Sequence, residues 1–282
     1  WLLVIAMSVM IIGLSALIGG MNGADPGPSI IVGTIFATVY SLISYYASSS
    51  VALSVSGAKR IEKAQAPDLY NLIENLCIAN GQPMPAVYII DDASPNAFAT
   101  GRDPEHASIA FTTGILKLLT REELEGVAAH ELSHVKNYDI RVMTIVVVLV
   151  GLISLIADIM IHLRFRGSDK NNAGIALVLI GIALALLSPI FAKIIQLAVS
   201  RSREYLADAS GALLTRYPEG LARALEKIEN VARPLQHANH ATAHLYISNP
   251  FGADGTRSFF SNLFSTHPPV ADRVTRLRSM GR

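Results

Sequence analysis

Four long apolar stretches alternate with two polar regions along the chain. The apolar stretches cover approximately residues 1–20, 29–53, 142–163 and 173–199. At about 1.5 Å of rise per residue, each can cross a hydrocarbon core about 30 Å thick as a helix. Short polar turns, MNGADPGP and RFRGSDKNN, join the first stretch to the second and the third to the fourth. The pattern predicts two transmembrane hairpins, at 1–56 and 141–199.

The first apolar stretch, WLLVIAMSVMIIGLSALIGG, also resembles the core of a signal peptide. Such cores usually run for about 7–15 residues, and this stretch is longer. Because a second apolar stretch follows almost at once, we expect a retained membrane helix.

The polar regions, 57–140 and 200–282, have the patterns of one mixed domain in two halves. In the first half, a helical pattern ends at Gly81, and AVYIID, NAFATG and ASIAFTT predict short strands. Thr120 and Glu123 form a capping box that opens the next helix. The second half predicts three helices, in REYLADASGALLTR, PEGLARALEKIENVAR and HPPVADRVTRLRSM. The fold class expected is therefore a mostly α integral membrane protein with four transmembrane helices and an α+β domain with a small sheet.

The composition supports a membrane protein. Hydrophobic residues make up 51% of the chain, charged residues only 16%, and the mean hydropathy is +0.41. So few charges cannot solvate an ordinary surface, which makes the lipid bilayer a partner. The net charge of +1 gives no reason to expect nucleic acid. Cys77 is the single cysteine, so an intrachain disulfide is impossible, as is usual in a reducing compartment.

The sequence His130-Glu131-Leu132-Ser133-His134 carries the strongest chemical signal. On a helix, the two histidines lie one turn apart on the same face and can bind one zinc ion. Glu131 beside them can accept a proton from a metal-activated water. Asp139 follows closely enough to orient a ligating histidine. The alternative is a chance match on a solvated helix.

A third zinc ligand is expected on the segment SRSREYLADASGA, which follows the fourth apolar stretch. Glu204 and Asp208 lie one helical turn apart there, so one can bind zinc while the other orients a histidine. From this segment alone, an exposed acidic pair that balances Arg201 and Arg203 is the favoured interpretation.

Several motifs together resemble the membrane-bound zinc metalloproteases of the HtpX type, which are relatives of the integral-membrane CAAX prenyl proteases. The resemblance covers nearly the whole chain. It rests on NAFATG (96–101), TTGILKLLTREELEGVAAHELSHVKNYD (112–139), SREYLADASGA (202–212) and FSTHPPVADRVTRL (264–277).

The resemblance implies a gluzincin-like zinc peptidase domain with one Zn²⁺ per chain. Carried over residue by residue, it makes His130, His134 and Glu204 the zinc ligands and Glu131 the catalytic base. Asp208 then orients a ligand histidine as the last residue of E-x-x-x-D.

Further residues are candidates for contacts with substrate. His267 or Arg273 could stabilise the tetrahedral oxyanion, or could belong to a turn and a salt bridge. The resemblance also implies that substrate binds as an extra strand on a sheet edge, which we expect at ASIAFTT near Ala110, with Asn96 preceding it.

Three histidines in QHANHATAHLY, at helical spacing, could form a second metal site or lie in a polar connecting loop, which is the interpretation we favour. They are His237, His240 and His244.

The distribution of basic residues predicts which side of the membrane holds the catalytic domain. Seven lysines and arginines flank the membrane on the side of the polar regions, against three in the opposite turns. By the positive-inside rule, the domain faces the cytoplasm. The resemblance implies that the membrane is a bacterial inner membrane.

The sequence therefore predicts a membrane-embedded zinc endopeptidase whose substrates are polypeptides. From the resemblance we expect these to be damaged or misfolded membrane proteins. The alternatives are a CAAX-type prenyl-protein protease and a catalytically silent membrane scaffold. The sequence does not predict the oligomeric state.

Overall fold

The computed structural model describes residues 2–21, 25–146, 201–231, 234–236, 242–250 and 268–281. Most of the third apolar stretch, all of the fourth and the turn between them lie outside the described residues. The candidates His237, His240 and His267 also lie outside them. The described chain forms two compact units, one of residues up to Ser48 and one that begins at Ser49 and includes both polar regions.

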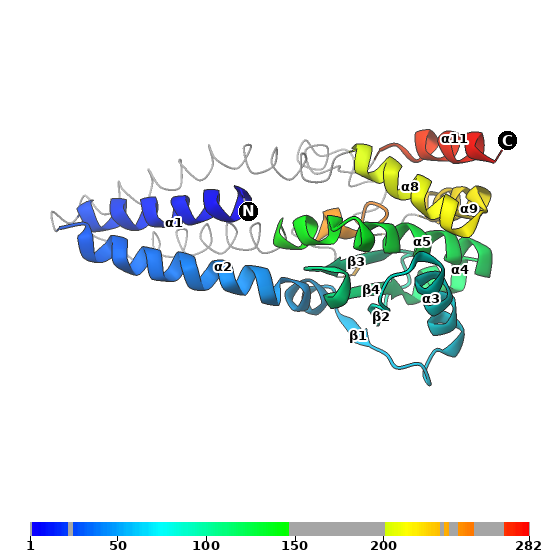
Figure 1. Ribbon diagram of the computed structural model, residues 1–282, viewed down its shortest axis with the longest axis horizontal. Coiled ribbons are helices and arrows are strands. Elements are labelled where there is room, and N and C mark those ends of the chain that lie inside the picture. The colour runs from blue at the N-terminus through cyan, green and yellow to red at the C-terminus, as the bar shows by residue number, and fades with distance from the viewer. Residues whose placement is uncertain are drawn as a thin grey trace. The chain divides into compact units, whose positions relative to one another are not determined.

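Two long apolar helices make up the described part of the first unit (Figure 1). They are α1, Leu2–Met21, and α2, Gly27–Val55, whose last turns belong to the second unit. The hydroxyls of Ser8 and Ser41 lie 3.2 Å apart across the pair, and a Cβ at Gly33 would collide with Ser15. Small side chains therefore let the two helices approach closely.

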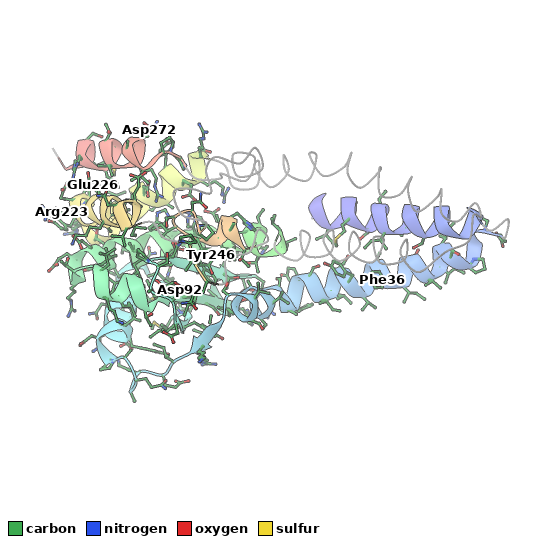
Figure 2. All side chains as sticks on the ribbon, turned by 180° about the vertical axis from the view of Figure 1, so that it is seen from behind. Phe36, Asp92, Arg223, Glu226, Tyr246 and Asp272 are labelled. Atoms are coloured by element: carbon green, nitrogen blue, oxygen red, sulfur yellow. The ribbon has the colours of Figure 1, made fainter. Side chains whose placement is uncertain are left out.

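Helix α2 exposes a row of large apolar side chains. Among them, Phe36 (labelled in Figure 2) is 52% exposed and Ile31 63%. Within the described residues, α2 is the one helix that is long and apolar enough to cross a membrane. A continuous apolar face is unfavourable in water but suits a hydrocarbon environment.

The second unit contains a four-stranded mixed sheet. Its strands are β1, Ala58–Arg60; β2, Ala86–Ile90; β3, Ala97–Gly101; and β4, Ala107–Thr112. The order across the sheet is β1-β2-β4-β3, with β2 and β4 parallel and the other pairs antiparallel. The three predicted strands are thus confirmed, and β1 is an addition.

The prediction that ASIAFTT lies at a sheet edge is wrong. Strand β4 pairs with β2 on one side and β3 on the other, so Ala110 is an inner position with 0% exposure. The chain folds back through the short helix η1, Pro104–His106, and thereby places β4 inside β3. The sheet edge on that side is β3.

Helices cover the sheet and contain most of the predicted site residues. They are α3, Pro67–Asn80; α4, Thr113–Leu118; α5, Arg121–Lys136; α8, Arg201–Thr215; α9, Pro218–Val231; η2, Ala243–Leu245; and α11, Val270–Met280. Helix α3 ends at Gly81 in the left-handed conformation, and Thr120 and Glu123 form the predicted capping box of α5.

Helix α5 is the central helix of the second unit. It lies against β3 on one side and against α8 and α9 on the other (Figure 1). Ile109 and Phe111 of the sheet and Leu132 of α5 are fully buried in the shared core. A rigid helix between two packed layers is a precise support for functional side chains. The described chain is therefore mostly helical with a small mixed sheet, as predicted.

Candidate metal centre

Helix α5 presents two histidines to one small space. His130 and His134 are 1% and 4% exposed, and their Nε2 atoms lie 3.2 Å apart. Two unprotonated imidazole nitrogens this close repel each other through their lone pairs. A metal ion bound by both nitrogens removes that repulsion. The capped N-terminus and the buried face of α5 fix both side chains.

Helix α8 adds a carboxylate from a distant part of the sequence. The Glu204 carboxylate oxygens lie 3.4 Å from His134 Nε2 and 3.9 Å from His130 Nε2. One ligand atom from each of these three buried residues lies within 4.8 Å of the others. Gly211 makes this approach possible, since a Cβ there would lie 3.0 Å from the backbone nitrogen of His130.

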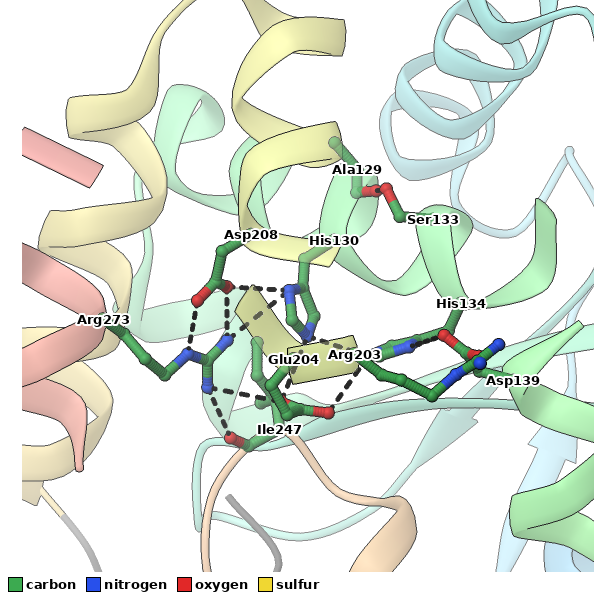
Figure 3. Close-up of polar contacts among 10 residues, drawn as sticks. All are labelled: Ala129, His130, Ser133, His134, Asp139, Arg203, Glu204, Asp208, Ile247 and Arg273. Atoms are coloured by element: carbon green, nitrogen blue, oxygen red, sulfur yellow. Dashed lines mark hydrogen bonds and ion pairs between the residues drawn. The ribbon is translucent and has the colours of Figure 1, made fainter. Parts of the chain in front are cut away.

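A carboxylate holds the other ring nitrogen of each histidine (Figure 3). Asp208 Oδ1 lies 3.0 Å from His130 Nδ1, and Asp139 Oδ2 lies 3.0 Å from His134 Nδ1. A neutral imidazole that donates its Nδ1 proton to a carboxylate keeps the lone pair on Nε2. Both lone pairs then point at the space shared with Glu204.

Each of these aspartates binds an arginine in turn (Figure 3). Arg273 of α11 donates from Nε and Nη2 to Asp208, at 2.8 and 2.7 Å. Arg203 of α8 donates to Asp139. The site therefore contains two parallel chains of histidine, aspartate and arginine.

The electrostatics of the site favour added positive charge. Burial by itself lowers the pKa of His134, but the hydrogen bond to Asp139 and the charges of Glu204 and Glu131 raise it to about 9. Burial by itself raises the pKa of Asp208, but the charge and hydrogen bonds of Arg273 outweigh it and hold that pKa at about 2.

The donor set fits a divalent zinc ion. Two imidazoles and one carboxylate are the ligand types of catalytic zinc sites. The four carboxylates of the site exceed its two guanidiniums by two negative charges, which one divalent cation neutralises. These charged residues are Glu131, Asp139, Glu204, Asp208, Arg203 and Arg273.

Comparison with known proteins assigns the family. Residues 63–281 match the model of Peptidase family M48, which is more than half of the chain. The chain belongs to peptidase family M48.

Two curated relatives of this M48 peptidase carry the same name. A "Protease HtpX homolog" of Tropheryma whipplei (strain Twist) is 51% identical over 249 residues, covering 88% of this chain and 84% of that protein. Another, of Streptococcus gordonii (strain Challis), is 39% identical over 288 residues, covering 99% of this chain and 96% of that protein. These matches confirm the predicted resemblance to HtpX-type membrane metalloproteases.

One solved structure resembles the M48 peptidase across its length. The crystal structure of S. mikatae Ste24p matches with a TM-score of 0.53 and 20% identity. The match covers 98% of this chain and 64% of the Ste24p chain, so this chain spans under two thirds of that protein. At this identity the likeness shows the fold alone.

The remaining predicted site residues of the M48 peptidase make different contacts. Asn96 is 1% exposed, and its side chain bonds to the backbone of Ser248. Arg273 forms the salt bridge that was the alternative to an oxyanion contact, and the oxyanion role stays a prediction. His244 hydrogen-bonds through Nε2 to the backbone carbonyl oxygen of Met143 over 2.8 Å, and it is not one of the three clustered ligands. Because that partner is a carbonyl, Nε2 is the donor.

Sequence reasoning missed the role of Arg203. The residue directly precedes Glu204, and the sequence around it is typical of an ordinary surface charge beside an acidic residue. Its partner Asp139 is 64 positions away, and no helical or strand periodicity links the two.

Proposed function

We propose that the chain is a membrane-embedded zinc-dependent endopeptidase with one zinc per chain. The observation that carries this proposal is the convergence of His130, His134 and Glu204 ligand atoms within 4.8 Å, in a buried space. The histidine Nδ1 atoms face carboxylates, which leaves both Nε2 atoms for metal.

When bound, zinc supplies Lewis-acid activation of water and of the scissile carbonyl. Glu131, beside His130 and 2% exposed, accepts the proton of the attacking water and passes it to the leaving amine. Asp208 and Asp139 keep the two histidines in one tautomer and orientation. Arg273 holds the pKa of Asp208 low and so keeps that carboxylate ionised, and Arg203 forms an ion pair with Asp139.

We propose that the edge of β3 binds the substrate main chain. Ile247 N donates to Ala97 O, and Thr144 Oγ1 bonds to both backbone groups of Gly101, so both ends of this edge are occupied. Ala99, between them, faces the same way by strand alternation, and its amide and carbonyl bond to none of the described residues outside the sheet. An extended peptide can pair there with little sequence preference.

We propose four transmembrane helices, at about 1–20, 29–53, 142–163 and 173–199, with a peptidase domain built from 57–140 and 200–282. The apolar face of α2 and the positive-inside distribution support this arrangement in a bacterial inner membrane, with the peptidase domain in the cytoplasm. The resemblance to HtpX-type proteases supports damaged or misfolded membrane proteins as the substrates.

The names of the curated relatives favour this function over a CAAX-type prenyl-protein protease. The complete ligand and base set, His130, Glu131, His134 and Glu204, argues against a catalytically silent scaffold, which does not need the base.

Metal analysis and a casein digestion test the proposal. Purified protein should contain about one zinc, as a single catalytic site requires. His130→Ala, His134→Ala and Glu204→Ala should each lose it. Full zinc retention in Glu204→Ala would assign the third ligand to another residue.

Glu131→Gln separates metal binding from catalysis. The amide keeps the size of the side chain but cannot accept a proton, so zinc should stay bound while digestion nearly stops. Self-cleavage during purification should stop as well. Substantial digestion by Glu131→Gln would mean that another group is the base.

A further inference from the structure

Arg203 occupies the junction between the two helices that supply the metal ligands. It lies in the first turn of α8, directly before Glu204. Its guanidinium donates to Asp139 Oδ1 and, over 3.1 Å from Nη2, to the backbone carbonyl of Asn137. Asn137 is the residue that ends α5. One side chain of α8 therefore binds two groups at the end of α5.

Asp139 divides its two oxygens between the arginine and a metal ligand. Oδ1 accepts from Arg203, and Oδ2 faces His134 Nδ1 at 3.0 Å. Tyr138, just before it, has a φ of 59°, in the left-handed region that bulky residues rarely adopt. This turn brings the Asp139 carboxylate to the Nδ1 atom of His134. The hydrogen bond from Arg203 restrains the rotation of that carboxylate.

An ordinary surface ion pair does not account for this contact. Exposed pairs contribute little because water screens them. The Arg203 side chain is 44% exposed, but that of Asp139 is 1% exposed and bonds to a buried histidine. Neighbouring Arg201 is exposed and makes no polar contact with the part of the chain that the structure describes.

We propose that Arg203 is a positioning residue of the metal centre. It holds Asp139 on His134 and ties the end of α5 to the start of α8, so that the ligands of the two helices keep their separation. This inference rests on the proposed function, in which His134 and Glu204 bind zinc.

Zinc affinity is the measurement that tests Arg203. Full-length protein with Glu131→Gln, to prevent self-cleavage, is titrated against a chromophoric chelator. Loss of a residue that orients a metal ligand typically weakens metal binding by about 10–100-fold. Arg203→Ala should fall in that range. Arg201→Ala, the matched loss of a charge two residues earlier, should bind zinc like the parent.

Two further variants show how Arg203 acts. Arg203→Lys keeps the charge but not the two-pronged geometry, so its zinc affinity should be intermediate. It also carries the test if Arg203→Ala does not fold. In an Asp139→Asn background, Arg203→Ala should add little further loss, because both changes interrupt the same chain of contacts.

Equal zinc affinity in Arg203→Ala and Arg201→Ala would overturn the inference. So would a lower melting temperature of metal-free Arg203→Ala with unchanged zinc affinity, since that result describes a structural ion pair. Additive losses in the Asp139→Asn background would show that Arg203 does not act through Asp139. A parent protein that binds no zinc would instead overturn the proposed function.

Discussion

Arg273 is the largest fully buried side chain in the described chain, and it carries a charge. A guanidinium loses its hydration on burial and must recover that free energy from partners. Asp208 provides two hydrogen bonds, Ile247 O lies 3.5 Å away, and Glu204 lies 3.9 Å away. At the scale of single residues, the metal centre thus depends on charges that do not bind metal.

Arg273→Met should strongly destabilise the protein. The change leaves Asp208 buried without its charged partner, and breaking a buried pair in this way typically costs about 3–5 kcal/mol of unfolding free energy. Thermal unfolding in detergent measures the effect. Arg276→Met is the control on the same helix, because Arg276 is exposed and packs over the Tyr205 ring at 3.8 Å. Equal melting temperatures for the two variants would contradict the prediction.

Cys77 should resist thiol reagents in the folded protein. Burial raises the pKa of its thiol to about 11, and the residue is 3% exposed. The reactive thiolate is therefore scarce below that pKa. Ellman's reagent at pH 8 should react slowly with native protein and rapidly after denaturation. Fast labelling of native protein would indicate that α3 opens readily.

At the scale of elements, the close contact of α5 with α8 depends on one small residue. Alanine normally favours a helix over glycine by about 1 kcal/mol. At Gly211 the added methyl would lie 3.0 Å from His130 N and 3.2 Å from His130 Cα, both backbone atoms. Backbone cannot move aside as a flexible side chain does, so the helices must separate.

Gly211→Ala should therefore lower both the melting temperature and the zinc affinity. Ser210→Ala, one position earlier and only partly buried, is the control and should change neither. The two measurements use the same purified proteins in detergent. A more stable Gly211→Ala with full zinc content would show that the helices tolerate the wider spacing.

Local signals predicted the elements better than their arrangement. The capping box at Thr120 and the stop at Gly81 follow from neighbouring residues, and both are present. The position of β4 inside the sheet could not be predicted from the residues, because strand order depends on how the chain folds back. Similarly, periodicity placed His130 and His134 on one face, whereas only packing pairs Arg203 with Asp139.

At the scale of the whole molecule, the central question is which side of the membrane holds the site. Single cysteines can answer it in a Cys77→Ser background. A cysteine at Glu105, exposed in η1, should not react with an impermeant reagent added to intact cells. Cysteines at Asn22 and Asn171, in the turns of the predicted hairpins, should react. The basic residues of RFRGSDKNN oppose an external position for Asn171.

Reaction of the cysteine introduced at position 105 in intact cells would place the peptidase domain outside the cytoplasm. Reaction at Asn22 without reaction at Asn171 would mean that the second hairpin does not fully cross. Permeabilised cells serve as the control, since all three positions should react there.

The clustered ligands are also synthesised at different times. The two histidines of α5 leave the ribosome long before Glu204, and Arg273 follows near the very end. The apolar residues of 142–199 are made in between. The cluster of three ligands is therefore incomplete until these residues and Glu204 have been made. A chain whose synthesis stops before Glu204 lacks one of the three clustered ligands, and one that stops before Arg273 lacks the buried partner of Asp208.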